Sequence, residues 1–188
     1  MLFLESLLPN IPTLITISRI VIIVPFILIA PEHPFIGALI FSIAAITDSL
    51  DGYIARKTGQ VTKVGILLDP IADKLLVISA IILLVDIEFI PAWIAIVIVA
   101  REFLITGLRI VALTKEILIP AEMGGKLKTT AQITSIITLF VDKSGVLDRI
   151  FFFVDLYAIG IIFIWIAMVL GVISGVQYFN HFLKRIRP

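Results

Sequence analysis

Residues 48–73 read DSLDGYIARKTGQVTKVGILLDPIAD, and the four aspartates in this stretch decide how the rest of the chain is interpreted. Asp48 and Asp51 are three positions apart, and Asp69 and Asp73 are four apart. If each segment is helical, each pair shares one face of its helix. Apolar residues precede the first pair and follow the second. Two helices joined by the short polar loop between the pairs would therefore bring four carboxylates together.

The overall composition is that of a membrane protein. Hydrophobic residues make up 60% of the 188 residues, and the mean hydropathy is +1.17, whereas soluble domains are about 45–50% apolar. The chain has no cysteine, which excludes a disulfide scaffold. Its 15 Lys and Arg nearly balance its 14 Asp and Glu, and a net charge of +1 provides no field that would attract nucleic acid.

Six apolar segments are candidates for bilayer crossings, each of which takes about 20 mainly apolar residues. The sequence therefore predicts an all-α integral membrane protein, a single domain over residues 1–188 with six transmembrane helices. Residues 2–8, which are apolar around Glu5, predict a short interfacial helix before the first crossing. The expected crossings are residues 14–30, 35–55, 69–85, 91–113, 129–141 and 156–180.

The positions of the basic residues predict the orientation. Lys and Arg collect in segments 56–63, 115–128 and 184–187, which six crossings would place on the same side as both termini. The connections on the other side contain only two basic residues, Lys143 and Arg149, and are made acidic by residues that include Glu32, Asp86, Glu88, Asp142 and Asp148. Because cytoplasmic loops carry the excess of Lys and Arg, both termini and the aspartates are expected to face the cytoplasm.

The aspartates predict a metal site. Four carboxylates in a low-dielectric cleft cannot all stay ionised without cations, and the neighbouring Arg56 and Lys74 are too few to balance them. Oxygen ligands suit hard ions such as Mg²⁺, Mn²⁺ or Ca²⁺ rather than zinc. A pair of Mg²⁺ or Mn²⁺ ions is a recurrent solution for phosphoryl chemistry. Gly52 and Ala55 would leave room for a substrate, whose phosphate oxygens Arg56 could bind.

Structural roles are an alternative for the same residues. Aspartates near helix ends often serve as caps, and small residues often mark surfaces where helices pack. Capping does not explain Asp48 and Asp51, however, because they lie near the C-terminal end of their expected helix, where the helix dipole disfavours anions.

With its spacing, the motif resembles the signature of the CDP-alcohol phosphatidyltransferase family at all eight specified positions: Asp48, Asp51, Gly52, Ala55, Arg56, Gly65, Asp69 and Asp73. Segments 10–19, 100–109 and 125–132 also resemble the bacterial branch that uses sn-glycerol 3-phosphate as acceptor. The resemblance covers nearly the whole chain. It implies the fold of that family, a homodimer, and a location in the bacterial cytoplasmic membrane.

The resemblance also implies an activity and residue roles. The reaction would transfer the phosphatidyl group from CDP-diacylglycerol to sn-glycerol 3-phosphate, giving phosphatidylglycerophosphate and CMP for phosphatidylglycerol and cardiolipin biosynthesis. Metal ligands would be Asp48, Asp51 and Asp69, and Asp73 would be the general base with a further metal contact. The nucleotide site would include Gly52, Ala55, Arg56 and Gly65, with Asn10 and Thr13 beside the cytidine.

The phosphate of the acceptor needs cations in a partly buried pocket. The candidates outside the motif are Arg101, Arg109, Lys126 and Lys128. The two lysines are equally well explained as anchors to anionic lipid. The two arginines lie on an expected apolar helix and need anionic partners there, of which Glu102 could supply one.

Two other functions stay open. A sibling transferase that uses serine, inositol or inositol phosphate as acceptor would carry the same motif. A divalent-cation transporter would also place acids inside the membrane, although these acids cluster near one face rather than the midplane, and no inverted repeat is visible.

Overall fold

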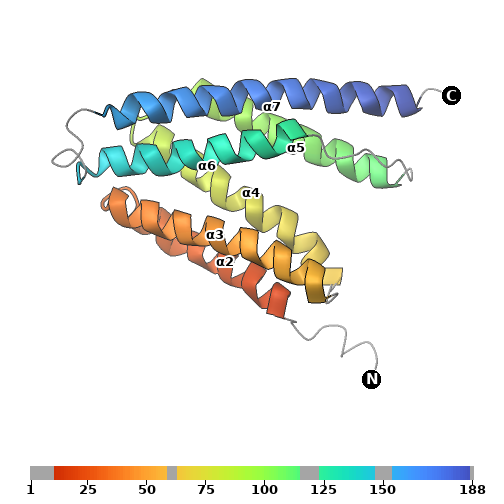
Figure 1. Cartoon of the computed structure of the whole chain (residues 1–188), viewed down its shortest axis with the longest axis horizontal. Coiled ribbons are helices and arrows are strands. Elements are labelled where there is room, and N and C mark those ends of the chain that lie inside the picture. Colours follow the sequence, from red (N-terminus) through yellow and green to blue (C-terminus); the bar gives the residue numbers. More distant parts are fainter. Residues whose placement is uncertain (1–10, 59–62, 115–122, 147–153, 187–188) are drawn as a thin grey trace. The chain divides into compact units, whose positions relative to one another are not determined.

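The computed structural model of the chain describes residues 11–58, 63–114, 123–146 and 154–186, and these residues form helices and short turns (Figure 1). The all-helical class predicted from the sequence is therefore confirmed for this part of the chain. The helices are α2 (Ile11–Ile29), α3 (Pro34–Thr58), α4 (Lys63–Asp86), α5 (Ala92–Thr114), α6 (Met123–Lys143) and α7 (Leu156–Ile186). The predicted interfacial helix at residues 2–8 lies outside the described residues.

Helix α6 begins six residues earlier than the sequence predicted. Gly124 and Gly125 suggested a loop, because glycine is a weak helix former. The hydroxyl groups of Thr129 and Thr130 nevertheless donate to the carbonyl oxygens four residues earlier, at 3.0 and 3.1 Å, as they do on a regular helix. Lys126 and Lys128 therefore lie on a helix and not in a loop.

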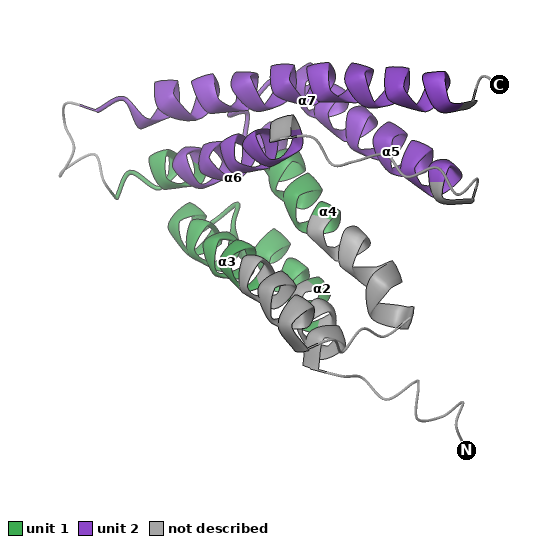
Figure 2. Ribbon diagram, turned by 45° about the vertical axis from the view of Figure 1, so that its right-hand side comes forward, with its two compact units in different colours: residues 1–83, 140–152 green, residues 84–139, 153–188 purple. Residues whose placement is uncertain are grey.

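The chain divides into two compact units, which Figure 2 shows in green and purple. Unit 1 comprises residues 1–83 and 140–152, and unit 2 comprises residues 84–139 and 153–188. Two of the three boundaries between them fall inside α4 and α6, and the third falls between residues 152 and 153, after α6 and before α7. A single domain over residues 1–188 stays a prediction.

In unit 1, α2 and α3 pack side by side and are joined by a tight turn (Figure 1). Phe26 on α2 is fully buried and contacts the rings of Phe41 and Phe140, with centroids 6.0 and 5.8 Å away. Close packing at the turn requires Gly37, because a Cβ atom there would lie 2.5 Å from the Cβ atom of Ala30 and 3.0 Å from its Cα atom.

We therefore expect Gly37→Ala to destabilise the protein by about 1–3 kcal/mol, the usual cost of overpacking. The backbone of Ala30 cannot move aside as the end of a flexible side chain could. The measurement is the midpoint of thermal unfolding in detergent, followed by tryptophan fluorescence. Gly107→Ala is the control, because no described atom lies within 4 Å of a Cβ atom placed at Gly107. Equal losses in both variants would contradict the proposed contact.

In unit 2, α5 packs along α7 (Figure 1), and α6 approaches α7 closely. Ser135 on α6 donates to the carbonyl oxygen of Gly160 at 2.7 Å, and a Cβ atom at Gly160 would lie 2.5 Å from the side chain of Leu139. Trp93 on α5 and Trp165 on α7 contact each other edge to face, with their ring centroids 5.3 Å apart. These contacts hold together the three helices that carry the charged residues described below.

Helix α7 has the length and composition of a membrane span. Residues Leu156–Arg185 have a mean hydropathy of 2.7 in their most apolar window, and only 22% of that window is buried within the protein. Most of its apolar surface therefore faces outward, as it does in a protein that contacts lipid. Shorter apolar helical segments occupy Ile20–Ile29 and Pro34–Thr47. The structure thus supports a membrane protein, whereas six crossings stay a prediction.

Candidate functional site

The motif aspartates lie on two consecutive helices. Asp48 and Asp51 belong to α3, and Asp69 and Asp73 belong to α4. The helical setting that the sequence predicted for both pairs is confirmed, so each pair shares one helix face. The side chains of residues 48–73 lie outside the part that the structure describes, so the convergence of the four carboxylates stays a prediction.

The predicted metal and nucleotide contacts also stay predictions, for the same reason. Gly52, Ala55 and Arg56 belong to α3 and Gly65 to α4, but their surroundings are not described. The side chain of Thr13 on α2 and the whole of Asn10 also lie outside the described residues. Among the side chains that are described, no group of three or more His, Asp or Glu residues could hold a metal ion. The motif aspartates do not belong to that set.

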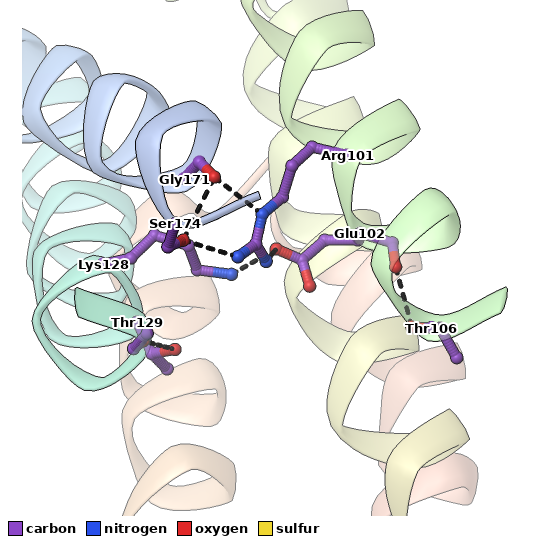
Figure 3. Close-up of polar contacts among 8 residues, drawn as sticks. Arg101, Glu102, Thr106, Lys128, Thr129, Gly171 and Ser174 are labelled. Carbon is purple, nitrogen blue, oxygen red and sulfur yellow. Dashed lines mark hydrogen bonds and ion pairs between the residues drawn. The ribbon is translucent and has the colours of Figure 1, made fainter. Parts of the chain in front are cut away.

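A second group of charged residues is described in full, within unit 2 (Figure 3). It consists of Arg101 and Glu102 on α5, Lys128 on α6 and Ser174 on α7, which we call the charged cluster. In Figure 3 the side chains of Arg101 and Glu102 extend from α5 toward the other two helices, and Lys128 approaches Glu102. Three helices thus contribute polar groups to one place.

Arg101 links α5 to α7 through its guanidinium group. Its Nε atom donates to the carbonyl oxygen of Gly171 at 2.9 Å, and Nη2 donates to the hydroxyl oxygen of Ser174 at 2.7 Å. Its Nη1 atom contacts Oε1 of Glu102 at 3.0 Å. Three different nitrogens of the planar guanidinium group reach three separate acceptors in this way, whereas a lysine at this position would bring a single nitrogen. Two of the three contacts hold Arg101 in place independently of Glu102.

Lys128 is buried, with 7% of its surface exposed, and its ammonium group pairs with the same Oε1 atom of Glu102. A buried ammonium group needs such a partner, because removal from water penalises the charge. One carboxylate therefore serves two cations, and the charged cluster has a net charge of +1. This excess positive charge makes the cluster suited to an additional anion.

Glycines on α7 make room for the two long side chains. A Cβ atom at Gly171 would lie 3.5 Å from Cδ of Lys128, and one at Gly175 would lie 3.5 Å from Cγ of Arg101. These are ordinary contact distances, so the aliphatic stems of both cations lie directly against the backbone of α7. The two glycines, four residues apart on α7, thus let charged side chains pack against the helix backbone, as such glycines also let helices pack closely.

A small pocket opens at the charged cluster. Arg101, Glu102, Lys128 and Gly171 form its polar wall, and the apolar wall consists of Val97, Ile98, Ala167 and Met168. About 10 Å³ is open to the centre of a water molecule, which is room for roughly one water. One helical turn after Lys128, the amide Nε2 of the buried Gln132 has no hydrogen-bond partner among the described residues. This region of α6 therefore contains one hydrogen-bond donor that no described acceptor satisfies.

The structure separates the four cations that the sequence proposed for the acceptor phosphate. Arg101 and Lys128 come together, whereas Arg109 and Lys126 are exposed and lie outside the charged cluster. Glu102 satisfies one arginine, as expected, and also satisfies Lys128, which was not expected. Sequence reasoning missed Ser174, although a serine between two glycines at helical spacing was a signal of a polar contact between helices.

Comparison with known proteins places this arrangement in context. The profile of the family described as CDP-alcohol phosphatidyltransferase matches residues 9–173. The chain is 40% identical over 187 residues to the CDP-diacylglycerol--glycerol-3-phosphate 3-phosphatidyltransferase of Bacillus subtilis (strain 168), with 91% of this chain and 94% of that protein covered. It is 41% identical to the protein of the same name from Rickettsia bellii, with coverage of 91% and 94%. A protein of that name from Haemophilus influenzae is 40% identical, with coverage of 90% and 91%.

Proposed function

This chain belongs to the CDP-alcohol phosphatidyltransferase family, and from this premise we propose that it transfers the phosphatidyl group of CDP-diacylglycerol to sn-glycerol 3-phosphate. The observation that carries the proposal is about 40% identity, over some 90% of both chains, to several proteins named for this reaction. The complete eight-position motif on α3 and α4 supports it further. The products are phosphatidylglycerophosphate and CMP.

In the proposed reaction, the carboxylate of Asp73 accepts the proton of an acceptor hydroxyl group. The hydroxyl oxygen then forms a bond to the β-phosphorus of CDP-diacylglycerol. The bond between that phosphorus and the oxygen bridging to the α-phosphorus breaks, and CMP leaves with the electron pair. Arg56, five residues after Asp51 on α3, is the group proposed to bind phosphate oxygens.

The donor set of the motif fits Mg²⁺ or Mn²⁺, because every candidate ligand is a carboxylate oxygen. Asp48, Asp51 and Asp69 would hold two ions, with a further contact from Asp73. When bound, such ions neutralise the pyrophosphate and stabilise the leaving group. The helical spacing of the two aspartate pairs supports this assignment, since positions three or four apart lie on one face of a helix.

The charged cluster is the proposed site for the phosphate of the acceptor. Arg101 and Lys128 provide two cations in a partly buried pocket, where charge-assisted hydrogen bonds to phosphate are strong. Arg109 and Lys126, which are exposed, stay predicted contributors. An acceptor without a phosphate group would have no use for this excess of cations, which favours glycerol 3-phosphate over serine or inositol.

The proposed setting is the cytoplasmic membrane of a bacterium, with six crossings, both termini and the active site on the cytoplasmic side, and two copies in a homodimer. The apolar length of α7 supports insertion in a membrane. The basic residues near the ends of α3 and α7 support the orientation, because positive residues are retained in the cytoplasm.

The deciding experiment measures CMP release by purified protein in detergent with CDP-diacylglycerol and either Mg²⁺ or Mn²⁺. Glycerol 3-phosphate, serine, inositol and inositol phosphate are compared as acceptors. We expect release that requires both the metal and glycerol 3-phosphate. Release with another acceptor would retain the family and overturn the proposed acceptor. Failure with all acceptors, together with uptake of ⁴⁵Ca or ⁵⁴Mn into liposomes, would favour a cation transporter.

A further inference from the structure

Resting on the proposed function, we propose that Glu102 is a built-in competitor of the acceptor. Its carboxylate occupies the place that a phosphate monoester takes, and Lys128 passes from Glu102 to the phosphate when the acceptor binds. Glu102 thereby weakens the affinity of the site for phosphate and sets the acceptor concentration at which the site fills.

The geometry of the contact is the first support. A single oxygen of Glu102 accepts from both Arg101 and Lys128. An oxygen of a phosphate monoester would make the same pair of contacts with the same two donors. Glu102 therefore imitates a bound phosphate in its charge, its acceptor atom and its partners.

The unequal anchoring of the two cations is the second support. Arg101 has two further contacts on α7, to Gly171 and Ser174, so it stays in place whether or not Glu102 contacts it. In the described part of the chain, Lys128 is held by Glu102. Its long stem rests against Gly171, where no side chain blocks it. Lys128 is therefore the group that can change partners.

The size of the pocket is the third support. With Lys128 on Glu102, the pocket has room for about one water molecule, and a phosphate group does not fit. Opening the pocket requires a side chain to move, and a charged partner must be supplied to Lys128 at the same time because a buried ammonium group is costly without one. An incoming phosphate supplies that charged partner, whereas water does not.

The test compares wild type with Glu102→Gln, which keeps the shape of the side chain and removes its charge. The affinity for inorganic phosphate is obtained from the rise of the unfolding midpoint with phosphate concentration, in detergent without lipid. We expect Glu102→Gln to bind phosphate at least fivefold more tightly and to show a lower KM for glycerol 3-phosphate. Glu88→Gln is the matched control, because Glu88 is exposed in the turn between α4 and α5. The phosphate affinity of this variant should stay within twofold of wild type.

A double-mutant cycle then tests whether the gain passes through Lys128. In a Lys128→Gln background, adding Glu102→Gln is expected to give a clearly smaller gain in phosphate affinity than it gives in the wild-type background, because only the Nη1 contact of Arg101 is then released. The double variant also keeps the net charge of the wild-type cluster. If Glu102→Gln alone does not fold, Glu102→Asp shortens the carboxylate by one methylene and should tighten phosphate binding at least twofold.

Weaker phosphate binding by the folded Glu102→Gln variant would overturn the proposal and make Glu102 a positioning residue for the two cations. An undiminished gain in the Lys128→Gln background would also overturn it, since the effect would then be one of general charge. Micelles that contain phosphatidate provide a separate arm, and a gain seen only there would overturn a soluble phosphate as the ligand. The phosphate-binding measurements do not need turnover, so they decide the role of Glu102 even if glycerol 3-phosphate is not the acceptor.

Discussion

Replacing Asp73 with asparagine is expected to lower kcat by about 10²–10⁴-fold while the affinity for CDP-diacylglycerol stays within about threefold of wild type. Asparagine keeps the size of the side chain and can still donate and accept hydrogen bonds, but its amide cannot take a proton from the acceptor hydroxyl. The measurement combines CMP release at saturating substrates with equilibrium binding of CDP-diacylglycerol in the presence of Mn²⁺.

Asp51→Asn is the matched comparison, because Asp51 is the proposed metal ligand on the other helix of the motif. Its loss should weaken the binding of Mn²⁺ and of CDP-diacylglycerol together, by at least tenfold each, because the pyrophosphate is held through the metal. If the two variants lost nucleotide binding equally, the division between base and ligand would be wrong.

Replacing Arg101 with alanine is expected to raise the KM for glycerol 3-phosphate by at least tenfold, or about 1.4 kcal/mol, and to change the KM for CDP-diacylglycerol by less than threefold. Removing one cation lowers the net charge of the charged cluster from +1 to 0, and Glu102 then neutralises Lys128 alone. Because that remaining pair is balanced, the variant is expected to fold. Steady-state kinetics with each substrate varied in turn give both values.

Ser174→Ala is the control for Arg101→Ala. It removes one of the hydrogen bonds that anchor Arg101 to α7 but leaves every charge in place, so we expect less than a threefold change in the KM for glycerol 3-phosphate. A large effect of Ser174→Ala with a small effect of Arg101→Ala would contradict a role for the guanidinium charge in acceptor binding.

The fold class was predictable from the sequence, because long apolar segments separated by polar turns leave few alternatives to helices. Pro34 begins α3, and Pro91 immediately precedes α5, where the sequence had placed the start of that crossing. The start of α6 was predicted wrongly, since Gly124 and Gly125 indicated a loop. Their low intrinsic preference for a helix is a weak signal that surrounding structure commonly overrides.

The motif could be found from the sequence because its residues are close along the chain and share helix faces. The charged cluster could not, since its contacts join residues far apart, such as Lys128 with Glu102 and Arg101 with Ser174. Lys126 and Lys128 look equivalent in sequence, and only the packing of α6 shows that one is exposed and the other buried. Local patterns specify helices well, but they do not specify which helices meet.

The contact between Arg101 and Ser174 also imposes an order on biosynthesis. The two residues are 73 positions apart, and at about 5–20 residues per second a ribosome needs about 4–15 s to add the intervening chain. During that interval Arg101 is without its two acceptors on α7, so α5, if it is a crossing as proposed, would enter the membrane with an unanchored guanidinium. The hydrogen bonds of the turn between α2 and α3 join residues close in sequence, so this turn can form almost as soon as its residues have been synthesised. Nascent chains arrested before Ser174 should therefore retain α5 less firmly in the membrane than chains that include it.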